Sequence, residues 1–526
     1  MLSVGARRKH RLPTTKEAVT RQFVELEKPV ALRRNIGVFK AMNIVVGCTI
    51  GGGIFISPKG ILINSGSVGT AMIVWSICGV ITLLGALSYI ELGTTIQRCG
   101  GDYAYIKEAF GPILAFLRLW TQMIIIRPAV IAVICRTAAT YCVKPFFEYC
   151  EPPILSVDLL AAAIIVLLTF VNCFRLSWAT KVQDFCAVGK VAGLGLIIFA
   201  GLLDVWFGKG TLKNFTFEGP PLDPSKLSQA FYSGMFAYAG WFYLNTVTEE
   251  IHRPEKTMPR AMIIGEVVVI AMYLLTIFAY HIVMSAQDVI DSSAVAVTFA
   301  KSAMGSLGWT VPIAVLISCV GVANGIFLAT SRVMYAGARD GTLPTILKTL
   351  HVTKCTPMPA IILLCPISLG MLAVSDVSQL ITFLSSVRWL FIGMSALAIP
   401  WLRYKQPYRH RPVRYPVWIP IVFAACCVAM VTMSGYSSPI AMATGLGITA
   451  TGLPVYWLVR VQKPAWLQNC IDKMTVKLQL LLKCLEEQAD DEDAKKSEVA
   501  KAIDHSVIPK EKRRYKNGHT YATTAL

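Results

Sequence analysis

The sequence predicts an all-α membrane protein that crosses the bilayer many times, and three observations lead to this fold class. The chain has 526 residues, of which 55% are hydrophobic and only 15% are charged, whereas a soluble domain is about 25% charged. Apolar runs of about 18 or more residues, long enough to cross a bilayer as helices, recur along the chain. Two of these runs are interrupted by glycine, at Gly51-Gly52-Gly53 and around Gly240.

The apolar runs correspond to about twelve transmembrane helices. Their limits are set by polar loops and by glycine or proline turns, so each end is fixed only to within a few residues. The expected spans are 38–64, 69–92, 103–141, 155–174, 183–206, 228–250, 259–284, 308–338, 357–374, 378–402, 416–435 and 439–460.

Four regions follow from this division of the chain. Residues 1–37 are polar and basic without a cleavable signal peptide, so we expect a cytosolic tail before a transmembrane domain over 38–461. Residues 462–487 place apolar side chains at helical spacing with lysines between them. We expect an amphipathic helix on the cytosolic leaflet, with a helix packed under the bundle as the alternative. The mixed-charge segment 488–526 is expected to be disordered.

The net charge of +19 would suit a nucleic-acid partner only if the basic residues formed one patch. They lie instead in the N-terminal tail, near the C-terminus and in the loops that follow even-numbered spans, whereas the other loops are poorer in lysine and arginine. This distribution is the positive-inside bias of a membrane protein. It predicts that both termini are cytosolic and that no nucleic acid is bound.

The two glycine-interrupted spans indicate a substrate site. An opened helix at membrane depth is tolerated where it lines a cavity, and broken helices in corresponding positions of two halves are typical of inverted-repeat transporters. Amides at a half-helix N-terminus attract a carboxylate, and carbonyls at a C-terminal end accept from an ammonium. Such a site suits a free amino acid. Two glycine-containing helices that simply pack closely are the alternative.

Three cations lie within expected spans, at Arg127, Lys190 and Arg388. Ionisable groups at this depth are candidates for function, so these cations indicate an anionic guest or an acidic partner. Arg127 could instead make a structural ion pair, and the ammonium of Lys190 could reach the membrane surface. A buried Lys190 could take the place of a driving cation, which would make sodium unnecessary. The acids that could pair with these cations are Glu91, Glu249 and Glu266.

With these features assembled, the chain over about 38–485 resembles the light chains of heterodimeric amino-acid transporters, in the amino acid–polyamine–organocation superfamily. The resemblance implies a LeuT-like fold of five-plus-five inverted repeats with helices 1 and 6 broken. The segments that carry the resemblance are Gly51-Gly52-Gly53-Ile54-Phe55-Ile56-Ser57-Pro58-Lys59-Gly60, Gly85-Ala86-Leu87-Ser88-Tyr89-Ile90-Glu91-Leu92-Gly93-Thr94, Ala237-Tyr238-Ala239-Gly240-Trp241-Phe242-Tyr243-Leu244-Asn245 and Thr248-Glu249-Glu250.

Within this family the sequence is most similar to the cystine/glutamate exchangers. Phe242 follows Gly-Trp where large-neutral exchangers have asparagine, and Arg388 stands where they lack an arginine. The resemblance implies sodium-independent antiport of extracellular anionic cystine for intracellular glutamate by alternating access, with Phe236 closing over the substrate. Phe236 stands where these exchangers have tyrosine. The implied substrate-binding residues are Gly51, Gly52, Gly53, Arg127, Phe236, Ala237 and Arg388, with Lys190 as the substitute for a sodium site.

Two departures from the cystine/glutamate exchangers alter the expected pocket wall, because Gly52 replaces an alanine and Val322 replaces a serine. A neutral amino-acid exchanger of the same family is therefore an alternative function. An alternative from another class is a transport-inactive amino-acid sensor or a trafficking partner of the heavy chain. The sequence contains no nucleophile elbow, phosphate loop, cofactor motif or zinc-ligand spacing, so we expect neither an enzyme nor a bound metal or cofactor.

The fifteen cysteines are an odd number, and most lie inside expected spans as small apolar residues. Cys150 lies in the outer loop after the third span, where intermolecular pairing is favoured. In the family, a cysteine at this place bonds a single-span glycoprotein heavy chain, so the resemblance implies a heterodimer in the plasma membrane. A free thiol is the alternative.

Overall fold

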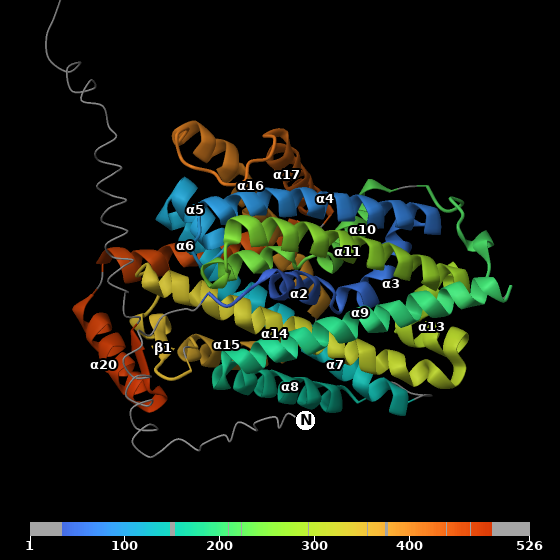
Figure 1. Cartoon of the computed structure of the whole chain (residues 1–526), viewed down its shortest axis with the longest axis horizontal. Helices are drawn as coiled ribbons and strands as arrows, with labels where there is room; N and C mark the ends of the chain where they lie inside the picture. Colours follow the sequence, from blue (N-terminus) through green and yellow to red (C-terminus); the bar gives the residue numbers. More distant parts are fainter. Residues whose placement is uncertain are drawn as a thin grey trace, which may run out of the picture. The chain divides into compact units, whose positions relative to one another are not determined.

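A computed structural model describes residues 34–147, 153–208, 210–221, 223–292, 294–354, 356–373, 377–437, 439–462 and 464–486. Over these ranges the chain is almost entirely helical (Figure 1). Cys150 lies outside the described residues, as do nearly all of the two expected tails, 1–37 and 488–526.

The first part of the chain runs through two short helices, a long helix, another short helix, one long span interrupted by a π-helix, and two further long helices. The elements are α2 (Val38–Thr49), α3 (Gly53–Ser65), α4 (Val68–Thr95), α5 (Asp102–Phe110), α6 (Pro112–Thr121), the π-helix η1 (Gln122–Ile126), α7 (Arg127–Val143), η2 (Lys144–Phe146), α8 (Ile154–Phe174), α9 (Leu176–Trp206) and η3 (Leu212–Asn214).

The second part repeats the pattern of a broken helix followed by long helices. Its elements are α10 (Pro224–Ala237), the 3-10 helix η4 (Trp241–Glu250), α11 (Pro254–Val283), α12 (Ala286–Asp291), α13 (Val295–Met304), η5 (Gly305–Trp309), α14 (Thr310–Arg339), η6 (Thr345–Lys348), β1 (Thr349–His351), α15 (Met358–Leu372), α16 (Val377–Lys405), α17 (Trp418–Ser437), α18 (Pro439–Ala450), α19 (Gly452–Tyr456), the π-helix η7 (Trp457–Gln462), α20 (Ala465–Leu482) and β2 (Cys484–Glu486), which pairs with β1.

Eight helices among the described residues are long and apolar enough to cross a membrane, and the bent pair α2–α3 would make a ninth. These findings confirm a polytopic all-α membrane protein, a coarser result than twelve spans. The expected span 228–250 is divided between α10 and η4, and the span expected over 357–374 is the 15-residue helix α15.

The third expected span begins later than the sequence predicts. Residues 103–110 belong to the separate helix α5, and the apolar span starts at Pro112. Gly111 adopts φ +97°, a conformation that favours glycine because it has no Cβ. Pro112 then occupies the first helical position, where its missing N–H is harmless. The Gly111-Pro112 pair therefore ends one helix and starts another.

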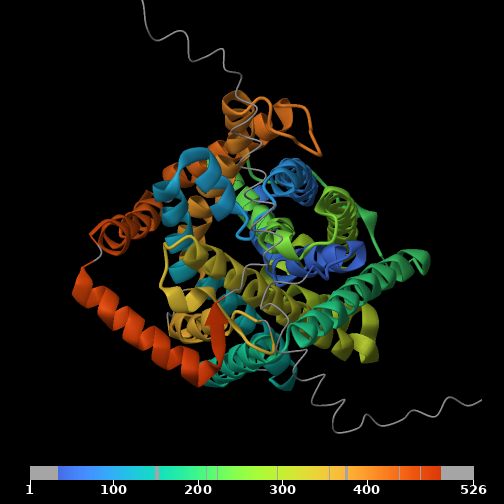
Figure 2. The same ribbon diagram turned by 60° about the vertical axis from the view of Figure 1, so that its left-hand side comes forward.

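The broken pair α2–α3 lies inside the helix bundle. α2 packs against α9, α11, α14 and η4, and α3 packs against α10 and α4. Around them, α11 lies between α4 and α9, and α14 lies against α9 and α7 (Figures 1 and 2). The apolar side chains of these helices form a continuous buried core. The glycine-interrupted stretches are thus surrounded by protein, as an opened backbone at membrane depth requires.

Candidate functional site

The first break separates α2, which ends at Thr49, from α3, which begins at Gly53, and the two helices are bent by 43°. Ile50 to Gly52, between them, are buried. The first amides of a helix have no intrahelical partner, and they form the positive end of its dipole. The buried start of α3 is therefore a place where an anionic group is stabilised.

The two breaks touch through their backbones, and glycine makes this possible. A Cβ at Gly53 would lie 2.6 Å from Cα of Ala237, at the end of α10. A Cβ at Gly240 would overlap backbone atoms of Thr49 and Cys48, at the end of α2. Gly52 differs, because a Cβ there would meet only side chains, at 3.4 Å or more. Close approach of the backbones explains Gly53 and Gly240 but does not require glycine at 52.

A tyrosine that the sequence reasoning missed joins the same two breaks. The hydroxyl of Tyr273, on α11, donates to carbonyl oxygens at the ends of both broken helices, 2.8 Å away at Thr49 and 3.1 Å away at Ala237. These carbonyls cannot be bonded within their own helices. Tyr273 therefore stabilises the opened backbone of α2 and α10 together.

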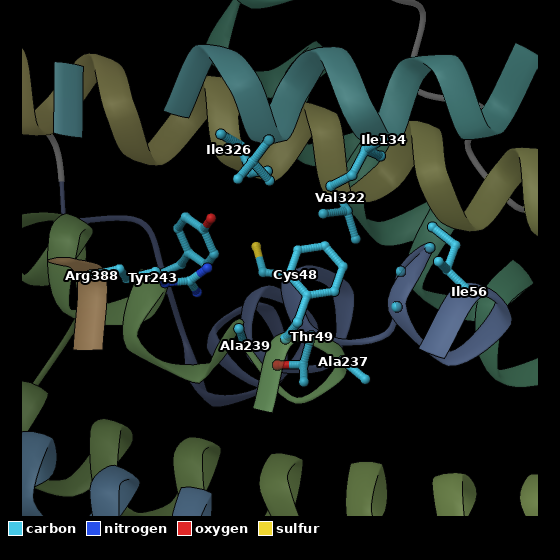
Figure 3. A pocket seen from close by; sticks show the side chains of 15 residues that line it. Cys48, Thr49, Ile56, Ile134, Ala237, Ala239, Tyr243, Val322, Ile326 and Arg388 are labelled. Atoms are coloured by element: carbon cyan, nitrogen blue, oxygen red, sulfur yellow. The ribbon is translucent and has the colours of Figure 1, made fainter. Parts of the chain in front are cut away.

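A pocket that is partly open to solvent lies at the two breaks. Six of the seven predicted substrate-binding residues line it, all except Arg127. The lining residues are Cys48, Thr49, Gly51, Gly52, Gly53, Ile56, Val130, Ile134, Phe236, Ala237, Ala239, Tyr243, Val322, Ile326 and Arg388. Figure 3 shows Arg388 beside Tyr243 at one end of this pocket and Ile56 at the other.

Arg388 comes from the middle of α16 and brings a cation to the pocket. It is 8% exposed, and its Nη2 has no hydrogen-bond partner among the described residues. The guanidinium carbon lies 4.9 Å from the centre of the Phe242 ring, a cation–π contact that stabilises the charge only in part. A buried guanidinium with an unused donor at a pocket wall is suited to bind an anion.

Arg127 lies behind the pocket wall rather than in it. Its guanidinium carbon is 4.1 Å from the centre of the Tyr243 ring, and Tyr243 lines the pocket. With its amide oxygen turned toward the guanidinium, Gln122 accepts from Nε at 2.8 Å and also from Nη2. Gln122 begins the π-helix η1, which ends immediately before Arg127. A π-helix commonly marks a functional site, and Pro128 is a local cause of the irregular bonding.

Lys190, on α9, is only 1% exposed, and its ammonium donates to the carbonyl oxygen of Gly47 near the end of α2. The ammonium of Lys190 therefore does not reach the membrane surface, and the alternative given in the sequence analysis is wrong. A cation at the C-terminal end of a helix is favoured by the helix dipole. Lys190 thus lies beside the first break but outside the pocket lining.

None of the three acids expected as possible partners forms an ion pair with these cations in the described part of the chain. Glu91 pairs with Arg403 at 2.5 Å, and Glu249 pairs with Arg339 at 2.5 Å. Neither carboxylate oxygen of Glu266 has a hydrogen-bond partner over the described ranges. The structure therefore gives no acidic partner to Arg127, Lys190 or Arg388 in the part of the chain that it describes.

Comparison with known proteins identifies the family. Residues 36–459 match the amino acid permease model. The chain is 44% identical over 466 residues to the human cystine/glutamate transporter, covering 88% of this chain and 93% of that protein. It is 42% identical over 456 residues to the rat large neutral amino acids transporter small subunit 2 (85% of each), and 40% identical over 433 residues to the human Asc-type amino acid transporter 1 (82% and 83%). The family resemblance seen in the sequence is confirmed, and the chain belongs to the amino acid permease family.

Proposed function

We propose that this protein is a sodium-independent amino-acid antiporter that imports anionic cystine in exchange for intracellular glutamate by alternating access. The observation that carries the proposal is Arg388, a buried cation at the pocket wall with an unused donor. The similarity to the cystine/glutamate transporter supports the same substrates. The relatives named above are transporters, which argues against an enzyme.

The substrate would lie along the pocket with its two ends held differently. Its α-carboxylate would bind the amides of Gly51, Gly52 and Gly53, and its α-amine would bind carbonyls at the breaks. The distal carboxylate would lie near Arg388, with Arg127 adding positive charge from behind Tyr243. Phe236 would close over the substrate, and Ala237 would line its path.

We further propose the LeuT-like arrangement of about twelve helices, with spans 1–5 and 6–10 as inverted repeats. Its support is the pair of breaks, five expected spans apart, that meet through Gly53 and Gly240. Lys190 would replace a sodium ion beside the first break, since its ammonium already binds the carbonyl of Gly47. Sodium would then be unnecessary for substrate binding.

The partner is proposed to be a single-span glycoprotein heavy chain, bonded through Cys150 in the plasma membrane, with both termini cytosolic. The name of the rat relative, a small subunit, supports a second chain. We propose the interfacial helix within 462–487 at α20; its support is that Leu480 and Leu481 are each 76% exposed, as suits a membrane surface. The cytosolic tail over 1–37 and the disordered tail over 488–526 stay predictions.

Exchange of neutral amino acids is the second candidate function. It is favoured by the similar identity to the neutral transporter, 42% against 44%. The charge of Arg388 separates the two candidates, because a buried cation left without its anion disfavours a neutral substrate. A transport-inactive sensor would bind substrate without accumulating it.

Counterflow in proteoliposomes tests the proposal. The full chain is reconstituted and the uptake of labelled cystine is measured with glutamate, leucine, alanine or no amino acid inside, with and without sodium. We expect uptake to require an internal amino acid, to be fastest with glutamate and to be unchanged when sodium is removed. Leucine exchange that outcompetes both anions would establish the neutral exchanger, and binding without accumulation would establish the sensor.

A further inference from the structure

One buried acid is not used by the proposed substrate site. Glu266 lies on α11, with 0% of its surface exposed, and both of its carboxylate oxygens lack a hydrogen-bond partner among the described residues. It is not among the residues that line the pocket. A glutamine or leucine would be easier to bury at this position, so the presence of an ionisable group calls for a function.

The groups around Glu266 do not carry a compensating charge. From α4, the hydroxyl of Thr82 is near enough to the acid to donate to it, but its single proton is directed to the carbonyls of Cys78 and Gly79 in its own helix. From α10, Tyr238 is close enough to interact with the acid, and its hydroxyl also lacks a partner among the described residues. Tyr273 lies two helical turns after Glu266 on α11, on the same side of that helix.

The neighbouring stretches of α2, α9 and α4 supply no cation to the carboxylate either. From α2, Val45 faces Gly265, the residue before the acid. From α9, Lys190 gives its ammonium to Gly47. From α4, the thiol of Cys78 lies near Tyr238 rather than near the acid. An ionised carboxylate without a cation or a donor is strongly disfavoured when buried. These surroundings favour the neutral, protonated form of the Glu266 carboxyl.

The surroundings also connect Glu266 to the two breaks. The rings of Tyr238 and Tyr273 are 4.9 Å apart, and Trp75 contacts both with ring centres 5.8 Å away. Tyr273 donates to the carbonyls of Thr49 and Ala237. A negative charge on Glu266 would thus develop in the same buried cluster that holds the broken helices together.

We propose that Glu266 is a proton-binding site that couples pH to alternating access. With the proton bound, the neutral carboxyl stays buried between α11 and α4, and the two breaks keep the contacts seen here. In another conformation water reaches the carboxyl, which releases its proton to that water and leaves a carboxylate. The carboxylate must bind a proton again before this conformation can re-form. The coupling to transport rests on the proposed exchange function; the protonated state does not.

The sign of the pH effect follows from this scheme. Once the pH rises above the titration of the water-exposed carboxyl, the protonated fraction falls about tenfold per pH unit, and so does the population of the conformation described here. Exchange by the wild type should therefore slow with rising pH. A glutamine at 266 is neutral at every pH, so E266Q should lose this dependence and retain exchange at alkaline pH.

The experiment compares the wild type, E266Q and the control E218Q, in which an exposed acid of a loop is changed. Counterflow of the same labelled substrate is measured between about pH 6 and pH 9, so that titration of the substrate itself is common to all three. We expect E218Q to follow the wild type and E266Q to be flatter, with at least a tenfold higher rate than the wild type at the alkaline end. Identical profiles in all three would overturn the coupling.

A second measurement does not depend on transport. Infrared difference spectra of the purified full chain, E266Q against wild type at neutral pH, report the carbonyl stretch of a protonated carboxylic acid. The wild type should show this band, shifted by deuterium exchange, and E266Q should lack it. A carboxylate band in its place would contradict the proton site even if exchange proceeds. Conversely, the acid band without any counterflow would leave the proton site standing and remove the exchange function.

Discussion

The charged groups of this protein fall into two regions that are built in opposite ways. At or near the ends of α4, η4, α14 and α16, and between α5 and α6, buried charges are paired. Arg332 and Glu250 are 2.8 Å apart, Glu91 binds Arg403, and Arg118 binds Asp102. At the level of the breaks, Arg388 and Glu266 have unused polar atoms and no oppositely charged partner among the described residues.

This comparison distinguishes two kinds of buried charge. Paired charges stabilise the fold, whereas unpaired charges are suited to bind a substrate or a proton. Removing one member of a buried pair leaves an uncompensated charge and strongly destabilises a fold. A buried cation without a partner already carries this free-energy cost in the folded protein, and binding of an anionic substrate would reduce the cost. Stability should therefore depend on the paired region and transport on the unpaired one.

The largest expected effect is on stability, from R332Q. Glu250 would remain buried without its cation, at a cost of about 3–5 kcal/mol. We expect a lower unfolding temperature and less folded protein, measured by thermal unfolding of the purified chain. The double variant R332Q/E250Q removes both charges and should recover part of the loss. If R332Q unfolds like the wild type, the pair does not stabilise the fold.

A large effect on transport, without one on stability, is expected from R388N. Loss of a charge-assisted hydrogen bond to the distal carboxylate costs about 1.5–3 kcal/mol, or about 10- to 100-fold in competition by glutamate. Neutral amino acids should lose much less, and the unfolding temperature should be unchanged or higher. Competition curves for both substrate types measure the difference. An equal loss for neutral substrates would show that Arg388 is structural.

A moderate effect is expected at the contact between the breaks. In G53A the new methyl group would lie 2.6 Å from Cα of Ala237, and overpacking of this kind costs about 1–3 kcal/mol. G52A is the matched control, since its methyl group would meet only side chains at 3.4 Å or more. We expect G53A to lose most counterflow activity and G52A to retain it. Equal activity in the two would refute the backbone contact.

The smallest effect is expected from Y273F, which removes the hydroxyl shared by Thr49 and Ala237. One lost hydrogen bond costs about 1 kcal/mol. The unfolding temperature should fall by about one degree, because a given loss of free energy shifts it less in a long chain, and the exchange rate should change because the breaks are held less firmly. Y436F, at a tyrosine that is 82% exposed, is the control. A Y273F variant identical to it in both respects would show that the bridge is dispensable.

The sequence predicted the features that local chemistry determines. Glycines inside an apolar run located both breaks, and an arginine in the middle of an expected span located Arg388. These signals can be read from one segment of the sequence. A glycine or an arginine inside a membrane helix has a free-energy cost, so its presence indicates a function. The same reasoning also identified Glu266 as an acid at depth, but it could not say whether the acid has a partner.

The features that were missed depend on contacts between distant segments. Tyr273 looks like any tyrosine in an apolar helix, and only packing of α11 against α2 brings it to Thr49. The same is true of Tyr243 beneath Arg127. The pairing of Glu91 with Arg403 joins positions more than three hundred residues apart. Helical spacing along the chain carries no information on such pairs.

The backbone contact at Gly240 has a consequence for ligand design and for divergence of substrate preference. A side chain there would strike backbone atoms of Thr49 and Cys48, which cannot move aside without rebuilding both helices. Positions 53 and 240, where the two breaks meet, are therefore closed to most substitutions, whereas position 52 is not. Selectivity can change more readily through side chains away from this contact, such as Arg388 at the end of the pocket beside Tyr243. An inhibitor that distinguishes this protein from its relatives should vary at the end that meets Arg388.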